Sequence, residues 1–345
     1  MAVGGGRLGA TAMVALPLLL LLPSLAAATC RLPFHFPVGT GPSGATVGPR
    51  NSLVIVSDGG TILFADLEDF TVREDTALND KYRDGYGWFD LEGVAMTSPE
   101  STFLYIGMEN KAAVLEYEWH GSHKIFRRFS LAGFEQAGTV GIQSLTWVPT
   151  EASKHQGYFY VGSQLTGNIF IYELPLLDDT GPDATAELRS VWTPLKGNKN
   201  IAGLSFSSGY IFANYDDGTS NHVLIYPVLA TGLPGELKEQ YEVDVTNAQG
   251  MAVRKAGNGT WEMFFTSDTR QAVFAYTFRF ITGFELHGRC AVVTPNPGAL
   301  PGAGRRACSP GGPLLGFALS ILALAALVPL DGGASTVGRP QCLPG

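Results

Sequence analysis

A short motif that recurs roughly every 50 residues, a period typical of propeller blades, most constrains the fold of this chain. Each copy places a small residue, glycine in four cases, ahead of an apolar residue. The five copies are Ser43-Gly44-Ala45-Thr46-Val47, Glu92-Gly93-Val94-Ala95-Met96, Gln143-Ser144-Leu145-Thr146-Trp147, Ala202-Gly203-Leu204-Ser205-Phe206 and Gln249-Gly250-Met251-Ala252-Val253.

Each copy is followed by two runs rich in aromatic and β-branched residues with a short polar turn between them, the pattern of a β-hairpin. A weaker run of mixed polarity often comes next, as in Ile125–Phe129, Leu188–Trp192 and Tyr241–Val245, and suits a half-solvated edge strand. Four strands per copy predict an all-β fold, a β-propeller of five to six four-stranded blades. The sixth blade would combine Cys30–Val38 with Phe278–Val293, and a β-sandwich of irregular hairpins is the competing fold.

The N-terminus has the pattern of a cleaved signal peptide over residues 1–28. Arg7 supplies a basic start, Leu16–Leu22 an apolar core and Ala26–Ala28 a small-residue cleavage site. A signal anchor fits less well because the apolar core is short. The pattern predicts export, with the propeller domain spanning residues 29–293.

The C-terminal region changes character. Residues 294–313 are rich in Pro, Gly and Ala, as in a linker, and residues 314–330 form an apolar run that is short for a membrane span. A short polar tail, residues 331–345, follows. The run is read as a membrane anchor, as a lipid-anchor signal preceded by Gly302–Gly304, or as a segment without either role. We expect an extracellular or cell-surface protein attached to the membrane through this segment.

Export permits disulfide bonds, and the cysteines lie outside the repeated region. Cys30 precedes the first copy and Cys290 follows the last. Because a closed propeller brings its two ends together, we expect a Cys30–Cys290 bridge, worth on the order of 4–5 kcal/mol in the entropic estimate. Asn258-Gly259-Thr260 is a glycosylation sequon at Asn258.

Charge excludes one class of partner. The formal net charge is -8 and Lys and Arg form no cluster, which argues against nucleic acid. The six histidines are scattered, so no zinc-type set is present, and His120 and His123 are read as surface residues of a turn.

The side chains at two equivalent positions of the copies, most of them oxygen-bearing, should form rings around the propeller channel. One ring precedes the small residue of each motif (Ser43, Glu92, Gln143, Ala202 and Gln249), and another ends the next strands (Asp58, Glu109, Gln164, Asp216 and Asp268). Carboxylate and amide oxygens suit calcium. The predicted metal ligands are Glu92, Glu109, Asp58 and Asp268, with Asn214 and Asp216 as further candidates; the alternative is that these side chains only solvate a wet channel.

The segment Asp90–Ala95, followed by Phe103–Asn110, resembles the signature of the phytase-like propellers, which include the SdiA-regulated and esterase-like phytase families. The resemblance implies that calcium ions and basic side chains hold phosphate groups while a metal-activated water attacks. Lys111 and Arg270 are the candidate phosphate contacts. This sequence departs from the family because so few basic residues flank the predicted channel mouth.

Two functions follow from these observations. The leading hypothesis is an extracellular binding or scaffold module, stabilised by calcium or by the disulfide, whose partner is a protein, a glycan or a small molecule. The alternative is a calcium-dependent hydrolase of phytase-like or lactonase type acting at the channel mouth. The lactonase form needs a Glu, Asn and Asp set, which Glu92, Asn214 and Asp268 would supply. No Gly-x-Ser-x-Gly elbow is present for covalent hydrolysis.

Overall fold

A computed structural model describes residues 34–35, 41–69, 71–79, 81–82, 87–179, 181–195, 200–216, 218, 221–243, 245, 247–256 and 260–279. All of these belong to one compact unit. The regular structure of the described part is almost entirely β-strand, with a short 3-10 helix, η1 (Glu109–Lys111), between two strands and α-helical residues at 78–79 and 81–82.

The strands form five four-stranded antiparallel blades, which we number in chain order; three blades are separate sheets, and blades 2 and 3 are joined into one eight-stranded sheet. Blade 1 contains β2 (Pro42–Val47), β3 (Ser52–Ser57), β4 (Thr61–Asp66) and β5 (Val72–Ala77). Blade 2 contains β6 (Leu91–Ala95), β7 (Phe103–Met108), β8 (Ala113–Glu118) and β9 (Lys124–Leu131). Blade 3 contains β10 (Ile142–Pro149), β11 (Gly157–Ser163), β12 (Ile169–Glu173) and β13 (Asp183–Trp192). Blade 4 contains β14 (Ile201–Ser207), β15 (Tyr210–Asp216), β16 (Asn221–Pro227) and β17 (Glu239–Val243). Blade 5 contains β18 (Ala248–Ala256), β19 (Thr260–Ser267), β20 (Ala272–Arg279) and β1 (Phe34–His35).

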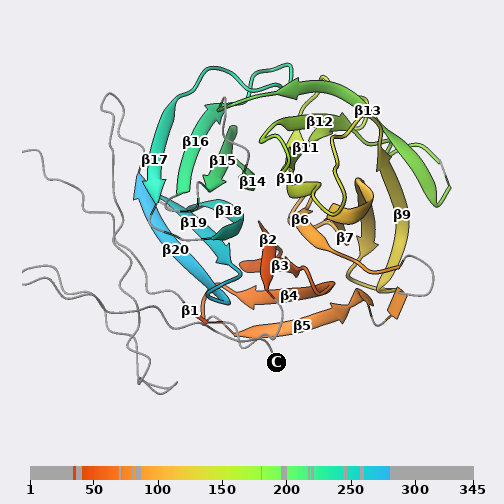
Figure 1. Ribbon diagram of the computed structural model, residues 1–345, viewed down its shortest axis with the longest axis horizontal. Helices are drawn as coiled ribbons and strands as arrows, with labels where there is room; N and C mark the ends of the chain where they lie inside the picture. Colours follow the sequence, from red (N-terminus) through yellow and green to blue (C-terminus); the bar gives the residue numbers. More distant parts are fainter. Residues whose placement is uncertain are drawn as a thin grey trace, which may run out of the picture. The chain divides into compact units, whose positions relative to one another are not determined.

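The first strand of each blade lies nearest the centre, and these inner strands contact one another around a closed ring (Figure 1). β2 touches both β6 of blade 2 and β18 of blade 5, which closes it. The propeller prediction is therefore confirmed, and the β-sandwich alternative is wrong.

The ring of described residues has five blades. The sequence left a sixth open, built in part from Cys30–Val38, but the strand in that segment completes blade 5. β1 pairs antiparallel with β20, with Phe34 opposite Val273 and His35 opposite Ala272. The N-terminal strand thus closes the ring by supplying the outermost strand of the last blade.

The core lies between neighbouring blades, where the apolar faces of successive sheets meet. Between blades 2 and 3, the Tyr105 and Phe159 rings lie 4.9 Å apart, and the Trp147 and Phe159 rings 4.8 Å apart. All three side chains are buried. Such aromatic pairs contribute about 0.5–1.5 kcal/mol each beyond their buried area, which favours a fixed blade-to-blade packing.

Close approach of the inner strands explains the repeated small residue. A Cβ atom on Gly93 would lie 2.6 Å from the backbone N of Leu145 in the next blade. One on Gly250 would lie 2.3 Å from the carbonyl oxygen of Ser43. The repeat therefore records a packing requirement at each junction of neighbouring inner strands.

The outer strands differ from expectation at one place. We expected β9 and β13 to be half-solvated edges, but they pair with each other in parallel, with Asp183 opposite Arg128, and join blades 2 and 3 into one eight-stranded sheet. Arg128 Nη2 lies 2.9 Å from Asp183 Oδ1 across this junction.

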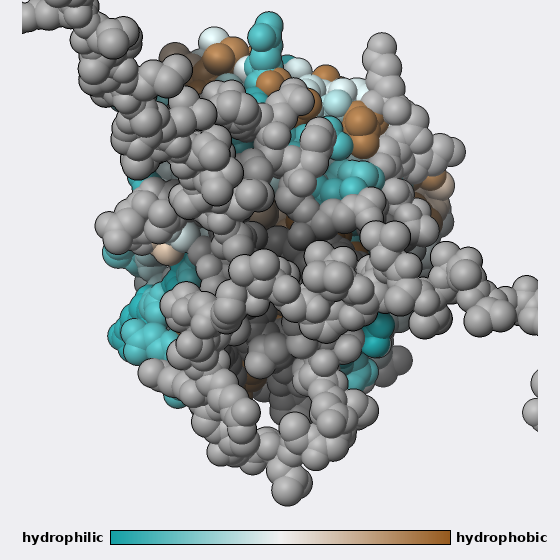
Figure 2. All heavy atoms as spheres, turned by 90° about the vertical axis from the view of Figure 1, so that its left-hand side faces the viewer, coloured by the Kyte–Doolittle hydropathy of each residue, from teal (hydrophilic) through white to brown (hydrophobic). Residues whose placement is uncertain are grey.

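Where described residues are visible on the β17 and β20 side of the molecule, hydrophilic and hydrophobic side chains are interspersed (Figure 2).

Several predictions fall outside the described residues: the signal peptide (1–28), the linker (294–313), the apolar segment (314–330), the tail (331–345), Cys30, Cys290 and Asn258. They remain predictions. Within the described part of the chain, no helix has the length and apolar character that a membrane crossing requires.

Candidate metal centre

A β-bulge in the inner strand of every blade sets the positions of the channel side chains. The pairing of each inner strand with its neighbour shifts by one residue just before the motif's apolar position. Bulges re-aim side chains and recur near functional sites. The residues at these shifts include the ring predicted from the motif, namely Ser43, Glu92, Gln143, Ala202 and Gln249.

Four of these five side chains are linked by hydrogen bonds. Ser43 Oγ and Gln143 Nε2 both donate to Glu92 Oε2, the second at 2.7 Å. Gln143 Nε2 also donates to Gln249 Oε1 at 2.9 Å. Because Gln143 and Gln249 belong to blades 3 and 5, which are not neighbours, this bond crosses the channel. Ala202 completes the ring as a buried apolar residue.

Three carboxylates converge beside this network. One oxygen atom from each of Asp58, Asp90 and Glu92 lies within 4.8 Å of the others. Asp58 follows β3 and Asp90 precedes β6, so neighbouring blades 1 and 2 supply the cluster. Of the Lys, Arg and His residues that the structure describes, none forms an ion pair with these three.

The cluster concentrates negative charge, and the pKa values respond. Burial first, and then the Asp58 carboxylate, raise the pKa of Glu92 well above its ordinary value. Part of Asp58 reaches solvent, yet desolvation by surrounding atoms, followed by the charges of Asp90 and Asp268, raises its pKa to about 6. The site therefore holds protons that a cation would displace.

Glu109 and Asp90 are neighbouring carboxyl groups at the edge of the cluster, and a proton on one of them allows a hydrogen bond to the other. Desolvation is the first cause of the raised pKa of both, and the Asp90 charge helps raise that of Glu109 to about 7. The backbone N–H of Gly141 donates to Glu109 Oε1 at 3.3 Å. Two carboxyl groups that share a hydrogen bond hold one proton between them near neutral pH.

Of the other predicted metal ligands, Asp268 lies near this cluster, whereas Asn214 and Asp216 form hydrogen bonds within blade 4. Asp268 lies beside the cluster, since its charge acts on Asp58 and its Oδ1 would lie 1.9 Å from a Cβ atom on Gly41. Asn214 instead donates to Asn221 Oδ1 at 2.7 Å, and Asp216 Oδ1 accepts from the Gly218 N–H at 2.7 Å.

The predicted phosphate contacts are exposed. Lys111 and Arg270 both face solvent, and among the described residues neither pairs with a carboxylate.

The sequence pattern did not predict Asp90 as a member of the cluster, although Asp90 begins the segment that resembles the phytase-like propellers. Asp90 and Glu92 are two positions apart, and side chains at that spacing in an extended chain point the same way. The alternation of side-chain directions along an extended chain could therefore have indicated Asp90. The repeated motif itself, defined by its small residue, includes only Glu92.

One buried polar atom beside the cluster has no partner among the described residues. Gln143 is 1% exposed, and its Oε1 accepts no hydrogen bond. Because its amide nitrogen binds Glu92 Oε2, the oxygen of the same amide lies within about 5 Å of that carboxylate. A buried unpaired acceptor costs about 1–3 kcal/mol unless something binds to it, and a cation is a suitable partner.

Searches against known protein families and curated proteins find no match for this sequence. Among solved structures, the chain is similar to the glutaminyl cyclase of Myxococcus xanthus, with 16% identity, a TM-score of 0.47, and coverage of 72% of this chain and 95% of that one. It is also similar to the β-propeller domain of Cps50 (Swd1) from Myceliophteria thermophila, with 12% identity, a TM-score of 0.38, and coverage of 70% and 71%. Similarity at this level leaves the function to be argued from the site.

Proposed function

We propose that this protein is a calcium-dependent binding module whose cation is held in the propeller channel by Asp58, Asp90 and Glu92, with Glu109 at the edge. The observation that carries the proposal is the convergence of three carboxylate oxygens within 4.8 Å of one another. Uncompensated carboxylates this close repel one another, and a divalent cation removes that repulsion.

The chemistry of the donors favours calcium. All the candidate ligands are oxygens, and calcium takes six to eight of them with loose geometry. The unpaired Oε1 of Gln143 would add a neutral oxygen to the carboxylates. Binding would also fix blades 1 and 2 to each other, since Asp58 and Asp90 come from different blades.

The binding surface follows from this placement. A cation at the channel would order the loops that follow β3 and β7 and precede β6, and these loops would meet a partner. Trp88, 53% exposed and two positions before Asp90, is the largest exposed aromatic side chain among the described residues. Together with the predicted export, this supports an extracellular partner, either a protein, a glycan or a small molecule. We also propose that residues 314–330 attach the protein to the membrane.

A second function is favoured by one observation. The Asp90 and Glu109 pair holds a proton near neutral pH beside the proposed cation, as a general acid or base would. This supports the calcium-dependent hydrolase alternative. The phytase-like form has less support because Lys111 and Arg270 are exposed residues without a described contact to the cluster.

Thermal unfolding of the full chain, in calcium and in chelator, tests the proposal. An ion at 100 times its dissociation constant stabilises the folded state by about 2.7 kcal/mol. Calcium should raise the Tm of the wild type and leave that of Glu92→Gln unchanged. Glu262→Gln is the matched control, because Glu262 is also buried but pairs with Arg254 at 2.7 Å. It should lower the Tm and keep the calcium response. A wild type that calcium does not stabilise would overturn the proposal.

Turnover separates the two functions. If the protein is a hydrolase, Glu109→Gln should abolish hydrolysis of a phosphomonoester or lactone while calcium still raises the Tm. In a binding module, no turnover of either substrate class is measured at any calcium concentration.

A further inference from the structure

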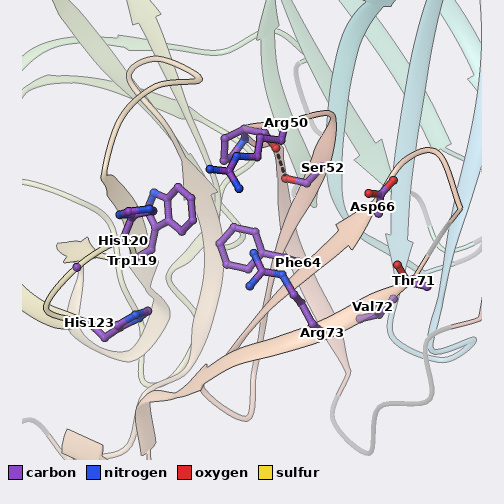
Figure 3. A pocket seen from close by; sticks show the side chains of 12 residues that line it. Arg50, Ser52, Phe64, Asp66, Thr71, Val72, Arg73, Trp119, His120 and His123 are labelled. Carbon is purple, nitrogen blue, oxygen red and sulfur yellow. Dashed lines mark hydrogen bonds between the residues drawn. The ribbon is translucent and has the colours of Figure 1, made fainter.

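A second concave site lies between blades 1 and 2. Its cavity has a volume of about 600 Å³. It is lined by β3, β4, β5 and the β2–β3 turn of blade 1, together with the turn between β8 and β9 of blade 2 (Figure 3). Volumes of about 300–1,000 Å³ are typical of sites for small organic molecules.

This cavity is separate from the proposed metal centre. Ser52, the first residue of β3, lines the cavity, whereas Asp58 follows the last residue of the same strand. A six-residue strand spans about 20 Å, so the two sites lie at opposite ends of blade 1. Their ligands would not compete for the same side chains.

The charge of the cavity is opposite to that of the channel and of the chain as a whole. Arg50 and Arg73 line it and point toward its centre (Figure 3). Both are exposed, and the structure gives neither one a hydrogen bond or an ion pair with any described residue. Asp66 is the one described acidic residue in the lining, and its Oδ1 accepts from the Glu68 N–H at 2.6 Å. Two guanidinium groups are therefore left to bind an anion.

The wall of the cavity is aromatic and fixed. Phe64 is 2% exposed and lies 5.1 Å from the Trp119 ring, with Arg73 Cζ 4.8 Å from the Phe64 centroid. Trp119 Nε1 donates to the Ser101 carbonyl at 2.9 Å. On the other side of the turn, Tyr82 OH donates to the His123 carbonyl at 2.9 Å. The turn is thus tied down at both ends, and the wall is formed before a ligand arrives.

We propose that this cavity binds a small organic oxyanion, with its charged group between Arg50 and Arg73 and its apolar body against Trp119. Guanidinium groups match phosphate, sulfate and carboxylate in geometry and bind them bidentately. A half-buried indole beside two arginines favours a ligand with an apolar or planar body over a bare inorganic ion. His120 and His123, which we expected to be surface residues of a turn, both belong to the lining of the cavity.

Calorimetric titration of the full chain with phenyl phosphate, inorganic phosphate and phenol tests this proposal. The buffer contains chelator, so that calcium in the channel contributes nothing. Phenyl phosphate should bind with a stoichiometry of one and more tightly than inorganic phosphate, and phenol should give no detectable binding. Phenyl sulfate and benzoate then identify the preferred oxyanion.

Three variants locate the site. Arg50→Gln and Arg73→Gln should each weaken phenyl phosphate binding by about tenfold or more, the effect of losing a charge-assisted hydrogen bond. Lys154→Gln is the control, because Lys154 is also an exposed cation but lies between β10 and β11 of blade 3. It should bind phenyl phosphate as the wild type does. Circular dichroism confirms that each variant is folded. No binding at millimolar phenyl phosphate, or binding that Arg50→Gln or Arg73→Gln leaves unchanged, overturns the proposal.

Discussion

Gln143 of blade 3 donates a hydrogen bond of 2.7 Å to the carboxylate of Glu92 in blade 2. The two residues occupy equivalent positions in successive copies of the motif, and each sits at the bulge of its inner strand. The same Glu92 oxygen accepts from Ser43 of blade 1. One carboxylate therefore receives donors from both neighbouring blades, while Asp58 and Asp90 approach it as like charges.

Gln143→Leu should separate the two roles of this amide. The leucine has a similar volume but removes the donor to Glu92 and the unpaired Oε1. Without calcium we expect the free energy of unfolding to fall by about 1–3 kcal/mol, since Glu92 and Gln249 lose a buried partner. The calcium-induced rise in Tm should shrink as well, because one proposed ligand is gone. Urea unfolding in chelator and in calcium measures both effects, and an undiminished calcium response would exclude Gln143 as a ligand.

The raised pKa values predict that the stability of the calcium-free protein falls as the pH rises. They also predict that the stabilisation by calcium grows over the same pH range. The pKa of Asp58 rises from 3.8 to about 6 and that of Glu109 from 4.5 to about 7, with desolvation as the first cause of each. The folded state therefore binds these protons more tightly than the unfolded state. Their contribution to stability is complete below about pH 4 and is lost as the pH rises through 6 and 7.

Calcium should reverse this dependence, because it binds the ionised carboxylates. In chelator, the Tm of the full chain should decrease from pH 5 to pH 8 on account of this cluster, and the Tm difference between calcium and chelator should increase over the same range. Asp69 does not interfere, since its pKa is lowered by the Thr71 N–H and its contribution is lost only below its ordinary value of 3.8. A calcium-induced shift of equal size at pH 5 and pH 8 would contradict the assignment of these carboxylates as ligands.

Gly93→Ala tests why the motif carries a small residue. The added Cβ would lie 2.6 Å from the backbone N of Leu145, an atom that cannot move without shifting the inner strand of blade 3. Overpacking of this kind costs about 1–3 kcal/mol, and urea unfolding would report the loss. Ser144→Ala is the control at the equivalent position of blade 3. Its buried Oγ has no described partner, so the substitution should change stability little. Equal losses in both variants would mean that the clash is not the cause.

Most of the fold could be predicted from the sequence, because a propeller repeats its signal. The period of the motif, the paired apolar runs and the polar turns each recur, so weak evidence in one copy is supported by the others. The closing strand was the exception. Phe34 and His35 form a strand of two residues, and only its partner β20, far away in the chain, shows which blade it completes.

The members of the candidate site, apart from Asp90, were predictable from the sequence, but their geometry was not. The motif identified Glu92, Gln143 and Gln249 as ring residues, and these do meet. It did not predict the bulges that turn them, because an extra residue in one strand is visible only against the register of its partner. The cavity beside Arg50 and Arg73 was likewise hidden, since its residues come from different blades and share no spacing in the sequence.

The closure of the ring leads to a prediction about Cys30 and Cys290. β1 pairs with β20, with Phe34 opposite Val273, so the two ends of the propeller chain enter the same blade. A bridge between cysteines that flank those ends would keep them together in the unfolded chain as well. In the entropic estimate such a bridge contributes on the order of 4–5 kcal/mol.

Cys30→Ser should therefore lower the free energy of unfolding by up to about that amount, and Cys290→Ser should do the same. Urea unfolding with and without reductant makes the comparison. The control is Cys308→Ser, a change in the Pro-, Gly- and Ala-rich segment 294–313 that keeps both predicted partners. If the two cysteines are bridged, reductant destabilises the wild type and Cys308→Ser but adds nothing to Cys30→Ser. A wild type that is indifferent to reductant would mean that pairing of β1 with β20 closes the ring without a covalent bond.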